Sequence, residues 1–332
     1  MLGTWRFFLA ICVVASHLCP RVFGVHFGSY AVFAFYICSG YLMTKIINET
    51  YGYSILGVAR FILNRFLRIY PTYWTLLALA LLLGAVNGLL IRATVWTAPY
   101  MPITMQDWLK NLLIIGLNPG LTTPIESNPA ALTTAWSLSV ELIFYALISL
   151  GFSRSRVVTI IWFACSLVVT CAMIFLEYDF AHRYFPFAAA SLPFSMGAIL
   201  HWWRPKLPSW SLGCLLLSFI LILVLGANGT VNSTFAGMYI ALFLSFLIQG
   251  ELIKVSCANT KIKETDNILG DLSYPIFLIH MVAGFFAVAI VGVKTDLWIL
   301  GLGLCTSMAV GFLVITFIEK PIKRIRAQVR SG

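Results

Sequence analysis

Long apolar segments separated by short polar ones dominate the pattern along the chain. A membrane-spanning helix needs roughly 17 to 25 mostly apolar residues, and the sequence contains ten segments of about that length. They cover residues 5–20, 29–47, 68–91, 133–152, 156–177, 184–203, 210–226, 232–253, 268–290 and 295–318. The pattern therefore predicts an all-α, polytopic membrane protein with about ten transmembrane helices.

The composition points to the same class of protein. Of the 332 residues, 60% are hydrophobic and only 10% are charged, whereas an ordinary soluble domain has about 25% charged residues. The mean hydropathy is +0.92. These values exclude a cytosolic enzyme, a secreted module and a disordered scaffold. We expect residues 1–332 to form a single integral membrane domain surrounded by membrane lipids.

Basic residues indicate the orientation of the spans. In a ten-span arrangement, 17 of the 22 Lys and Arg residues fall on the side of the two termini. The other five are Arg21, Arg92, Lys110, Arg183 and Lys294. Because positive residues mark cytoplasmic loops, both termini are predicted to be cytoplasmic. The net charge of +10 is scattered singly between apolar segments, so it indicates topology and no nucleic-acid partner.

The eight cysteines fall almost entirely within apolar segments. There is no CxxC pair, and no His stands beside a Cys at metal-ligand spacing. We therefore expect neither a disulfide framework nor a metal site.

The longest connection, about residues 92–132, lies outside in this arrangement. Its segment from Trp108 to Leu117 is apolar but too short to cross a membrane. The sequence predicts an interfacial or re-entrant segment there.

Ionisable residues within spans are costly and are candidates for function. Glu141 lies deep in an apolar segment, and Arg6 and His17 share one face of the first span, about 16 Å apart. Counted from the predicted span ends, His17 and Glu141 are expected to meet at one depth. A His beside a carboxylate can serve as the general base that activates an alcohol for acyl transfer. Packing for Glu141 and interhelical hydrogen bonding for His17 are open alternatives.

Arg65 and Arg68 occupy neighbouring helix positions just before the third span. An Arg side chain binds phosphate oxygens in pairs, so with Arg6 these residues would form a cytoplasmic phosphate site beneath His17. Anchoring to lipid headgroups explains the same residues without a ligand, and spacing alone favours it.

Three further polar residues lie within apolar segments. Ser39, beside Gly40, and Ser137 are best explained as helix-packing residues or interhelical donors. For His280, a second polar wall of the site and simple packing are both open.

Together these residues resemble the acyltransferase-3 family of integral membrane acyltransferases, many of which O-acetylate bacterial surface glycans. The family's hallmark is an Arg, ten residues and a His on the first span, present here as Arg6 and His17. Further blocks similar to the family are Phe35–Tyr41, Arg65–Pro71, Trp136–Glu141 with Phe144–Tyr145, Leu269–His280 and Glu319–Pro321.

The resemblance implies an acyltransferase domain spanning the chain in the bacterial inner (plasma) membrane. The implied donor is cytoplasmic acetyl-CoA, and the implied acceptor is a sugar hydroxyl of a surface polysaccharide, such as O-antigen or exopolysaccharide, or of a lipid-linked sugar. His17 is then the catalytic residue and Glu141 its partner. Arg6, Arg65 and Arg68 would contact the donor's phosphates. Further site candidates are Ser39, Tyr41, Trp136, Ser137 and His280.

Two alternatives remain from the sequence. In a proton-coupled transporter or flippase, Glu141, His17 and His280 would form a proton relay. An acyltransferase of the same chemistry with a lipid or small-molecule acceptor is the second.

Overall fold

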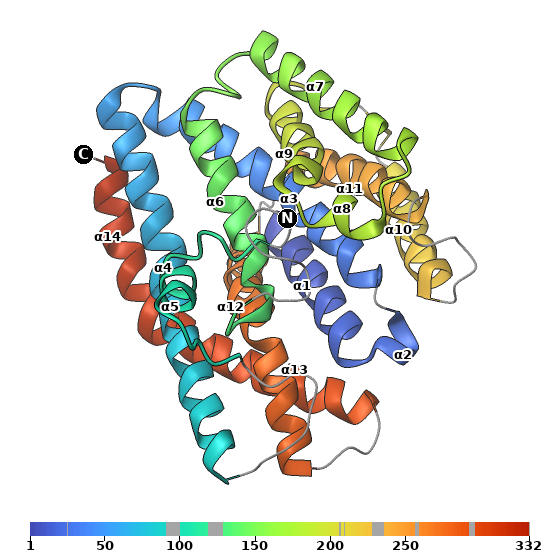
Figure 1. Cartoon of the computed structure of the whole chain (residues 1–332). Helices are drawn as coiled ribbons and strands as arrows, with labels where there is room; N and C mark the ends of the chain where they lie inside the picture. Colours follow the sequence, from blue (N-terminus) through green and yellow to red (C-terminus); the bar gives the residue numbers. More distant parts are fainter. Residues whose placement is uncertain are drawn as a thin grey trace.

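The computed structural model describes residues 1–24, 26–90, 100–118, 129–205, 207–208, 210–227, 236–255, 259–291 and 296–331. Helices make up the regular structure of these residues, and no strand occurs among them (Figure 1). The predicted all-α class is therefore confirmed for the described part of the chain.

The structure contains long helices joined by short helical turns. The long helices are α1 (Leu2–Leu18), α3 (His26–Ile46), α4 (Ile55–Leu90), α6 (Trp136–Ser149), α7 (Arg156–Phe175), α9 (Phe187–Trp202), α10 (Ser211–Ala227), α11 (Ala236–Lys254), α12 (Thr260–Val291) and α13 (Asp296–Val314). Shorter elements are α2 (Pro20–Phe23), η1 (Ile47–Tyr51), α5 (Met105–Leu113), η3 (Thr133–Ala135), α8 (Phe180–Tyr184), η4 (Ile315–Glu319) and α14 (Lys320–Ser331).

Each predicted apolar segment coincides with one of the long helices. Six helices of the described residues are long and apolar enough to cross a membrane: Phe27–Tyr51, Ile55–Val86, Arg156–Phe175, Ala236–Lys254, Thr260–Ala289 and Asp296–Arg330. Shorter apolar helices are Leu2–Leu18, Thr133–Ser149 and Ser211–Ala227. The chain is thus a membrane protein by the length and composition of its helices.

α1 and α12 run parallel and in register although they are far apart in the sequence. The backbone N–H of Gly3 donates to Asp266 at 3.2 Å, and His17 contacts His280; both pairs are 263 residues apart. A constant offset over 14 residues means that the helices stay in contact for about 21 Å. The approach is close, because a Cβ on Gly3 would lie 1.8 Å from the carbonyl oxygen of Asp266.

α3 runs parallel to both α6 and α9. Along α6, Ser39 contacts Glu141 and Asn48 donates to the carbonyl of Ser153. Along α9, the ring of Tyr36 stacks on that of Phe194, and Glu49 lies 3.8 Å from His201. The α3–α9 crossing is tight, since a Cβ on Gly197 would lie 2.1 Å from the carbonyl oxygen of Ile37.

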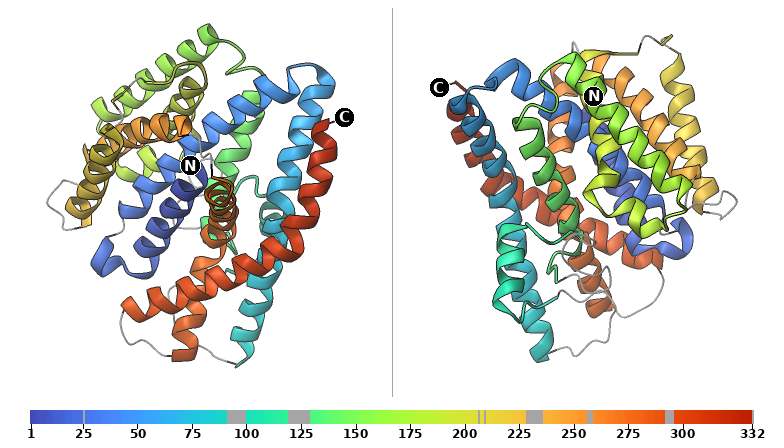
Figure 2. Two further views of the ribbon diagram at one scale, coloured as in Figure 1. Left: turned by 180° about the vertical axis from the view of Figure 1, so that it is seen from behind. Right: turned by 45° about the horizontal axis from the view of Figure 1, so that its top comes forward.

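The C-terminal helix α14 lies along the first half of α4 (Figures 1 and 2). Asn64 is fully buried between them and donates to the carbonyl of Arg326 at 3.2 Å. This contact explains why α4 begins at Ile55, well before the predicted span that starts at residue 68. The apolar pattern marks only the part of a helix that lipid surrounds, whereas residues 55–67 also pack on a basic helix.

α5 occupies the long connection and packs against the middle of α4. A capping box begins the helix: Thr104 Oγ1 accepts from the Asp107 N–H, and Asp107 accepts from the Thr104 N–H, which lowers the pKa of this exposed carboxyl. At the C-terminal end of α5, three side chains of α4 donate to its backbone carbonyls. Tyr70 donates to Leu113, Tyr73 to Asn111 and Trp74 to Leu112. α5 therefore docks on residues 70–74, well away from both ends of α4.

Some predicted features lie outside the described residues. They include the basic residues Arg92 and Lys294, one of the eight cysteines (Cys257), one of the 17 basic residues on the side of the termini (Lys206), and the segments 91–99 and 119–128 of the long connection.

Candidate functional site

His17 and His280 meet where α1 and α12 are still in contact near the end of α1. His17 Nδ1 lies 2.8 Å from His280 Nε2, and the two ring planes differ by 5°. Parallel rings stacked face to face do not approach closer than about 3.5 Å. The rings must therefore meet edge to edge in one plane, which is the geometry of a hydrogen bond between ring nitrogens.

Backbone carbonyls determine which nitrogens of this pair carry protons. His280 Nδ1 lies 2.9 Å from the carbonyl oxygen of Phe277 and 3.3 Å from that of Ile276. Carbonyl oxygens only accept, so Nδ1 of His280 holds a proton. In a neutral imidazole the other nitrogen is an acceptor, and His280 Nε2 therefore accepts from His17 Nδ1. Neutral His17 is left with an unprotonated Nε2, to which no described residue donates.

Burial gives the two imidazoles different roles. His280 is completely buried, whereas His17 keeps part of its surface exposed. A reacting molecule can reach His17 but not His280. The arrangement presents one accessible imidazole nitrogen with its lone pair available, as general-base catalysis requires.

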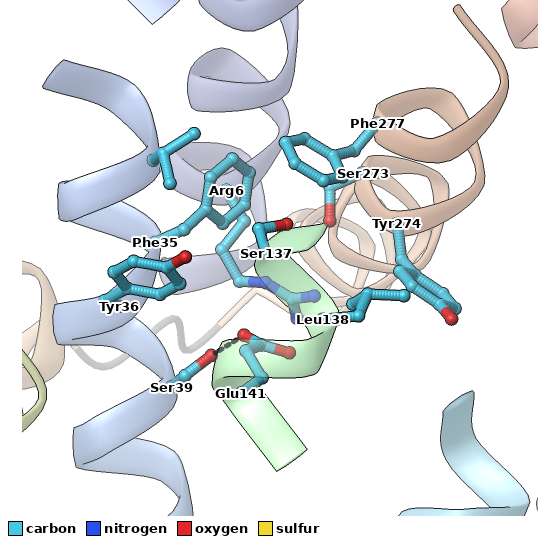
Figure 3. Close-up of a pocket in the computed structure, with 11 residues that line it drawn as sticks. Arg6, Phe35, Tyr36, Ser39, Ser137, Leu138, Glu141, Ser273, Tyr274 and Phe277 are labelled. Carbon is cyan, nitrogen blue, oxygen red and sulfur yellow. Dashed lines mark hydrogen bonds between the residues drawn. The ribbon is translucent and has the colours of Figure 1, made fainter. Parts of the chain in front are cut away.

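Glu141 belongs to a second polar cluster. It accepts hydrogen bonds from Ser39 of α3 and, at 3.0 Å, from Tyr145 one turn along α6. Figure 3 shows Arg6 of α1 extending its guanidinium toward the Glu141 carboxylate. Three helices thus bring a carboxylate, a cation and two hydroxyls together.

This cluster lies well away from the histidine pair. Gly28, near the start of α3, packs on Ser16 of α1, and the two helices run antiparallel. Ser39 is eleven residues further along α3, about 16 Å, so Ser39 and its partner Glu141 lie level with Arg6. The prediction that His17 and Glu141 share one depth is wrong.

The error has a structural cause at the start of α6. Ala130, Ala131 and Leu132 are buried before the helix begins, and Thr134 donates to the carbonyl of Phe277 at 3.0 Å. The chain therefore enters the bundle in non-helical form, and α6 starts deep inside it. The sequence-based count takes residue 133 as the outer end of the span and adds a helical rise for each residue. Because residue 133 is already inside the bundle, this count places Glu141 too close to the outer end, and so too close to His17.

Two adjoining cavities connect the regions of the site. Both are lined by Arg6, Ser39, Glu141 and Tyr274. The first extends to Phe277, whose ring centroid is 6.3 Å from that of His280. The second extends to Arg65 and Arg68. Together they form a route, lined by both polar and apolar side chains, from these arginines to Phe277 beside His280, although neither cavity is lined by His17 or His280.

The two arginines differ in how their charges are balanced. Arg68 pairs with the buried carboxylate of Glu319 and lies 3.9 Å from Asp271. Arg65 is only 7% exposed and donates to Asn64 at 2.7 Å and to Met43 at 3.5 Å. Within the described part of the chain, no carboxylate pairs with Arg65. Its positive charge is therefore available to a ligand.

A comparison with protein families supports the resemblance seen in the sequence. A family model described as an acyltransferase domain matches residues 2–318. The chain belongs to the acyltransferase-3 family. No match was found among curated proteins or among solved structures. The histidine pair, the Glu141 cluster, Arg65 and Arg68 all fall within the matched range, whereas Glu319 and α14 follow it.

The remaining candidates of this acyltransferase fall into two groups. Ser39 and Ser137 line the first cavity. Tyr41 and Trp136 line neither of the two cavities: Tyr41 is buried, and Trp136 meets the rings of Tyr184 and Phe185 edge-on. Their contacts are those of packing residues.

Other residues of the site were not singled out from the sequence. Tyr145 and Tyr274 line the cavities, and Glu319 accepts from Arg68 and from Thr72. All lie within blocks that resemble the family, so the signal was present. Tyrosines are common in membrane helices, so Tyr145 and Tyr274 do not stand out in the sequence. Glu319 lies at a predicted span end, where a charged residue is expected.

Among the described residues, no group of three or more His, Cys, Asp or Glu side chains could hold a metal ion.

Proposed function

We propose that this acyltransferase transfers an acetyl group from cytoplasmic acetyl-CoA to a sugar hydroxyl of a cell-surface polysaccharide, such as O-antigen or exopolysaccharide, in the bacterial inner membrane. One observation carries the proposal. The hydrogen-bonded His17–His280 pair leaves a partly exposed His17 with an unprotonated Nε2, and the cavities that begin at the arginines end at Phe277 beside this pair.

His17 is the general base of the proposed reaction. Its Nε2 takes the proton of the acceptor hydroxyl while that oxygen attacks the thioester carbonyl carbon. The new ester bond forms, the carbon–sulfur bond breaks, and His17 returns the proton to the departing CoA thiolate. General-base catalysis of this kind contributes about 10²- to 10⁴-fold in rate.

The donor enters from the side of Arg65. Arg6 and Arg65 line the second cavity and are the proposed contacts for the donor's phosphates, because guanidinium groups bind phosphate oxygens in pairs. Arg68 lines the same cavity, but its charge is already matched by Glu319 and Asp271. We therefore assign Arg68 to holding α4 against α12 and η4, and Arg65 to the donor.

Glu141 orients Arg6 along the route of the thioester arm. Arg6 and His17 are about 16 Å apart along α1, so an extended arm held by its phosphates at Arg65 passes the Glu141 cluster before it reaches His17. Glu141 in this proposal positions the donor and does not act on the reacting atoms.

The acceptor approaches from the opposite side of the bundle. His17 is one residue from the end of α1 and close to Arg21, which lies 3.8 Å from Asp296 at the start of α13. A polysaccharide or lipid-linked sugar outside the membrane fits this direction, and lipid or small-molecule acceptors are outcomes that the experiment below separates.

The helix directions support ten spans with both termini in the cytoplasm. In that arrangement α1 and α12 are the first and ninth spans, and α3, α6 and α9 are the second, fourth and sixth. Spans of like parity run in one direction, as α1 does with α12 and α3 does with α6 and α9.

A transporter finds less support than an acyltransferase. A proton relay needs Glu141 near the two histidines, but Glu141 lies level with Arg6, about 16 Å away along α1. The family membership also favours acyl transfer.

The experiment compares alkali-labile acyl groups on the envelope glycans of the native host. The gene is left intact, deleted, or restored as wild type, as His17→Ala or as His182→Ala. His182 is an exposed histidine on α8 that lines neither cavity and, among the described residues, is hydrogen-bonded only to Asp179. It serves as the matched control.

We expect deletion to remove the acyl groups, and wild type and His182→Ala to restore them. A membrane-inserted His17→Ala protein should not. Acyl groups that persist on every glycan after deletion would contradict the polysaccharide acceptor, and a lipid extract that loses acyl groups would identify the lipid alternative.

A further inference from the structure

The contact between α4 and α14 joins two guanidinium groups through one neutral side chain. Asn64 Oδ1 accepts from Arg65 at 2.7 Å and from Arg326 Nε and NH2 at 3.3 Å each. Since both groups bond one oxygen, their donor nitrogens lie within about 6 Å of each other. Two like charges at this distance repel each other, and an amide oxygen does not neutralise them.

Further positive charge surrounds the pair. Arg330 is close enough to Arg65 and Arg326 to act on both electrostatically. Two carboxylates act on the pair electrostatically, Glu319 on Arg326 and Glu141 on Arg65. Both are already engaged, because Glu319 accepts from Arg68 and Thr72, and Glu141 accepts from Ser39 and Tyr145. The described residues around Asn64 therefore carry an excess of positive charge.

The arrangement leaves donor groups unused. Arg65 is 7% exposed, and its Nε has no hydrogen-bond partner although the atom is buried. A buried donor without a partner is costly, and a ligand with several acceptor oxygens would satisfy it. Arg65 also lines the cavity that leads toward Arg6, so an anion bound here would lie at the mouth of the donor route.

We propose that Arg65 and Arg326, held by Asn64, bind a phosphomonoester, and that this group is the 3′-phosphate of the acyl-CoA donor. The assignment rests on the proposed function. A phosphomonoester carries three acceptor oxygens and nearly two negative charges, which suits two guanidinium groups. Arg326 is half-buried at the surface, and the 3′-phosphate is at the end of CoA remote from the thioester. The partly exposed Arg326 can therefore meet this phosphate beside the buried Arg65.

This site adds a residue that follows the family match. The matched range ends at residue 318, whereas Arg326 is on α14. The C-terminal helix would thus complete the donor site of this chain.

The test measures binding of CoA and of 3′-dephospho-CoA to the purified, detergent-solubilised protein by calorimetry. The variants are wild type, Arg326→Gln, Arg326→Lys and the control Arg324→Gln, whose side chain is exposed on the same helix. Thermal unfolding without ligand verifies that each variant folds.

Wild type and Arg324→Gln should bind CoA at least tenfold more tightly than 3′-dephospho-CoA, as one charge-assisted hydrogen-bond pair provides. Arg326→Gln should lose this preference while its affinity for 3′-dephospho-CoA stays unchanged, and Arg326→Lys should keep only part of it. A preference retained in Arg326→Gln would overturn the site and leave the proposed function standing. Wild type that binds neither ligand would overturn both.

A phosphomonoester could also come from a lipid headgroup. Nanodiscs with and without phosphatidic acid separate the two sources. If Arg326→Gln abolishes stabilisation by phosphatidic acid and leaves the CoA preference intact, the donor assignment is overturned.

Discussion

At the scale of single residues, His280 acts on His17 through one hydrogen bond. This bond fixes the proton on His17 Nδ1 and leaves Nε2 free to be the proposed general base. His280 itself is completely buried, so the proposed reaction gives it no contact with the substrate. It is a positioning residue. Whether His17 keeps its hydrogen bond in a variant depends on whether the side chain that replaces His280 can accept one.

We predict different outcomes for two substitutions at this position. His280→Leu removes the acceptor and should lower kcat by about 10²-fold or more, with little change in KM for acetyl-CoA. His280→Gln places an amide oxygen near the former Nε2 and should keep most of the activity. Steady-state kinetics in nanodiscs provide the measurement. Equal losses in both variants would show that His280 only fills space.

Arg68 and Arg65 should respond in opposite ways. Arg68→Gln leaves the Glu319 carboxylate buried without its partner, which costs about 3–5 kcal/mol, so thermal stability should fall. The double variant Arg68→Gln/Glu319→Gln should recover much of it. Arg65→Gln should raise KM for acetyl-CoA with a smaller effect on stability.

Thermal unfolding and donor titration separate these outcomes. An Arg68→Gln protein of wild-type stability would contradict the structural assignment of this ion pair, and an unchanged KM in Arg65→Gln would remove Arg65 from the donor site.

At the scale of the helices, close packing positions the chemistry. Gly197 lets α9 approach the backbone of α3, and Gly3 does the same between α1 and α12. Small residues allow this approach in membrane helices. The contact at Gly3 keeps α1 and α12 in register, and that register brings His17 to His280.

Gly197→Ala should destabilise the protein strongly, because its Cβ would lie 2.1 Å from the carbonyl oxygen of Ile37. Gly213→Ala on α10 is the matched control, since a Cβ there meets nothing within 4 Å. It should stabilise by up to about 1 kcal/mol through helix propensity. Thermal unfolding in one detergent compares the two. A Gly197→Ala protein as stable as Gly213→Ala would contradict the tight α3–α9 crossing.

The apolar pattern predicted where the helices lie but not which of them touch. Each long helix coincides with a predicted segment, because lipid imposes a minimum apolar length. The partner of His17 could not be predicted, since His280 is 263 residues away and only tertiary packing joins them. The depth of Glu141 could not be predicted either. Periodicity shows which face of α6 carries Glu141, whereas the depth of this residue in the bundle depends on the buried non-helical segment before α6.

At the scale of the whole molecule, the parallel helix pairs agree with the proposed arrangement, in which both termini lie on one side of the membrane. The N-terminal residues Gly3 and Thr4 bond to Asp266, and Lys323 of α14 pairs with Asp271. The start of α1, the start of α12 and α14 therefore lie together, as they must if the donor site is cytoplasmic.

Cysteine labelling tests this topology. In a variant without the native cysteines, Arg21→Cys should react with an impermeant maleimide in intact spheroplasts. Arg324→Cys should react only after permeabilisation. Reaction of both sites, or of Arg324→Cys alone, in intact spheroplasts would contradict the proposed orientation.

Acyl transfer from the cytoplasmic face is the central claim, and inside-out membrane vesicles from the native host test it most directly. Acetyl-CoA with a radiolabelled acetyl group is supplied outside the vesicles, and alkali-labile label in the glycan fraction is measured over time. We predict steady labelling with wild type and His182→Ala, and at least 10²-fold less with His17→Ala. No labelling with wild type, or wild-type labelling with His17→Ala, would contradict the account.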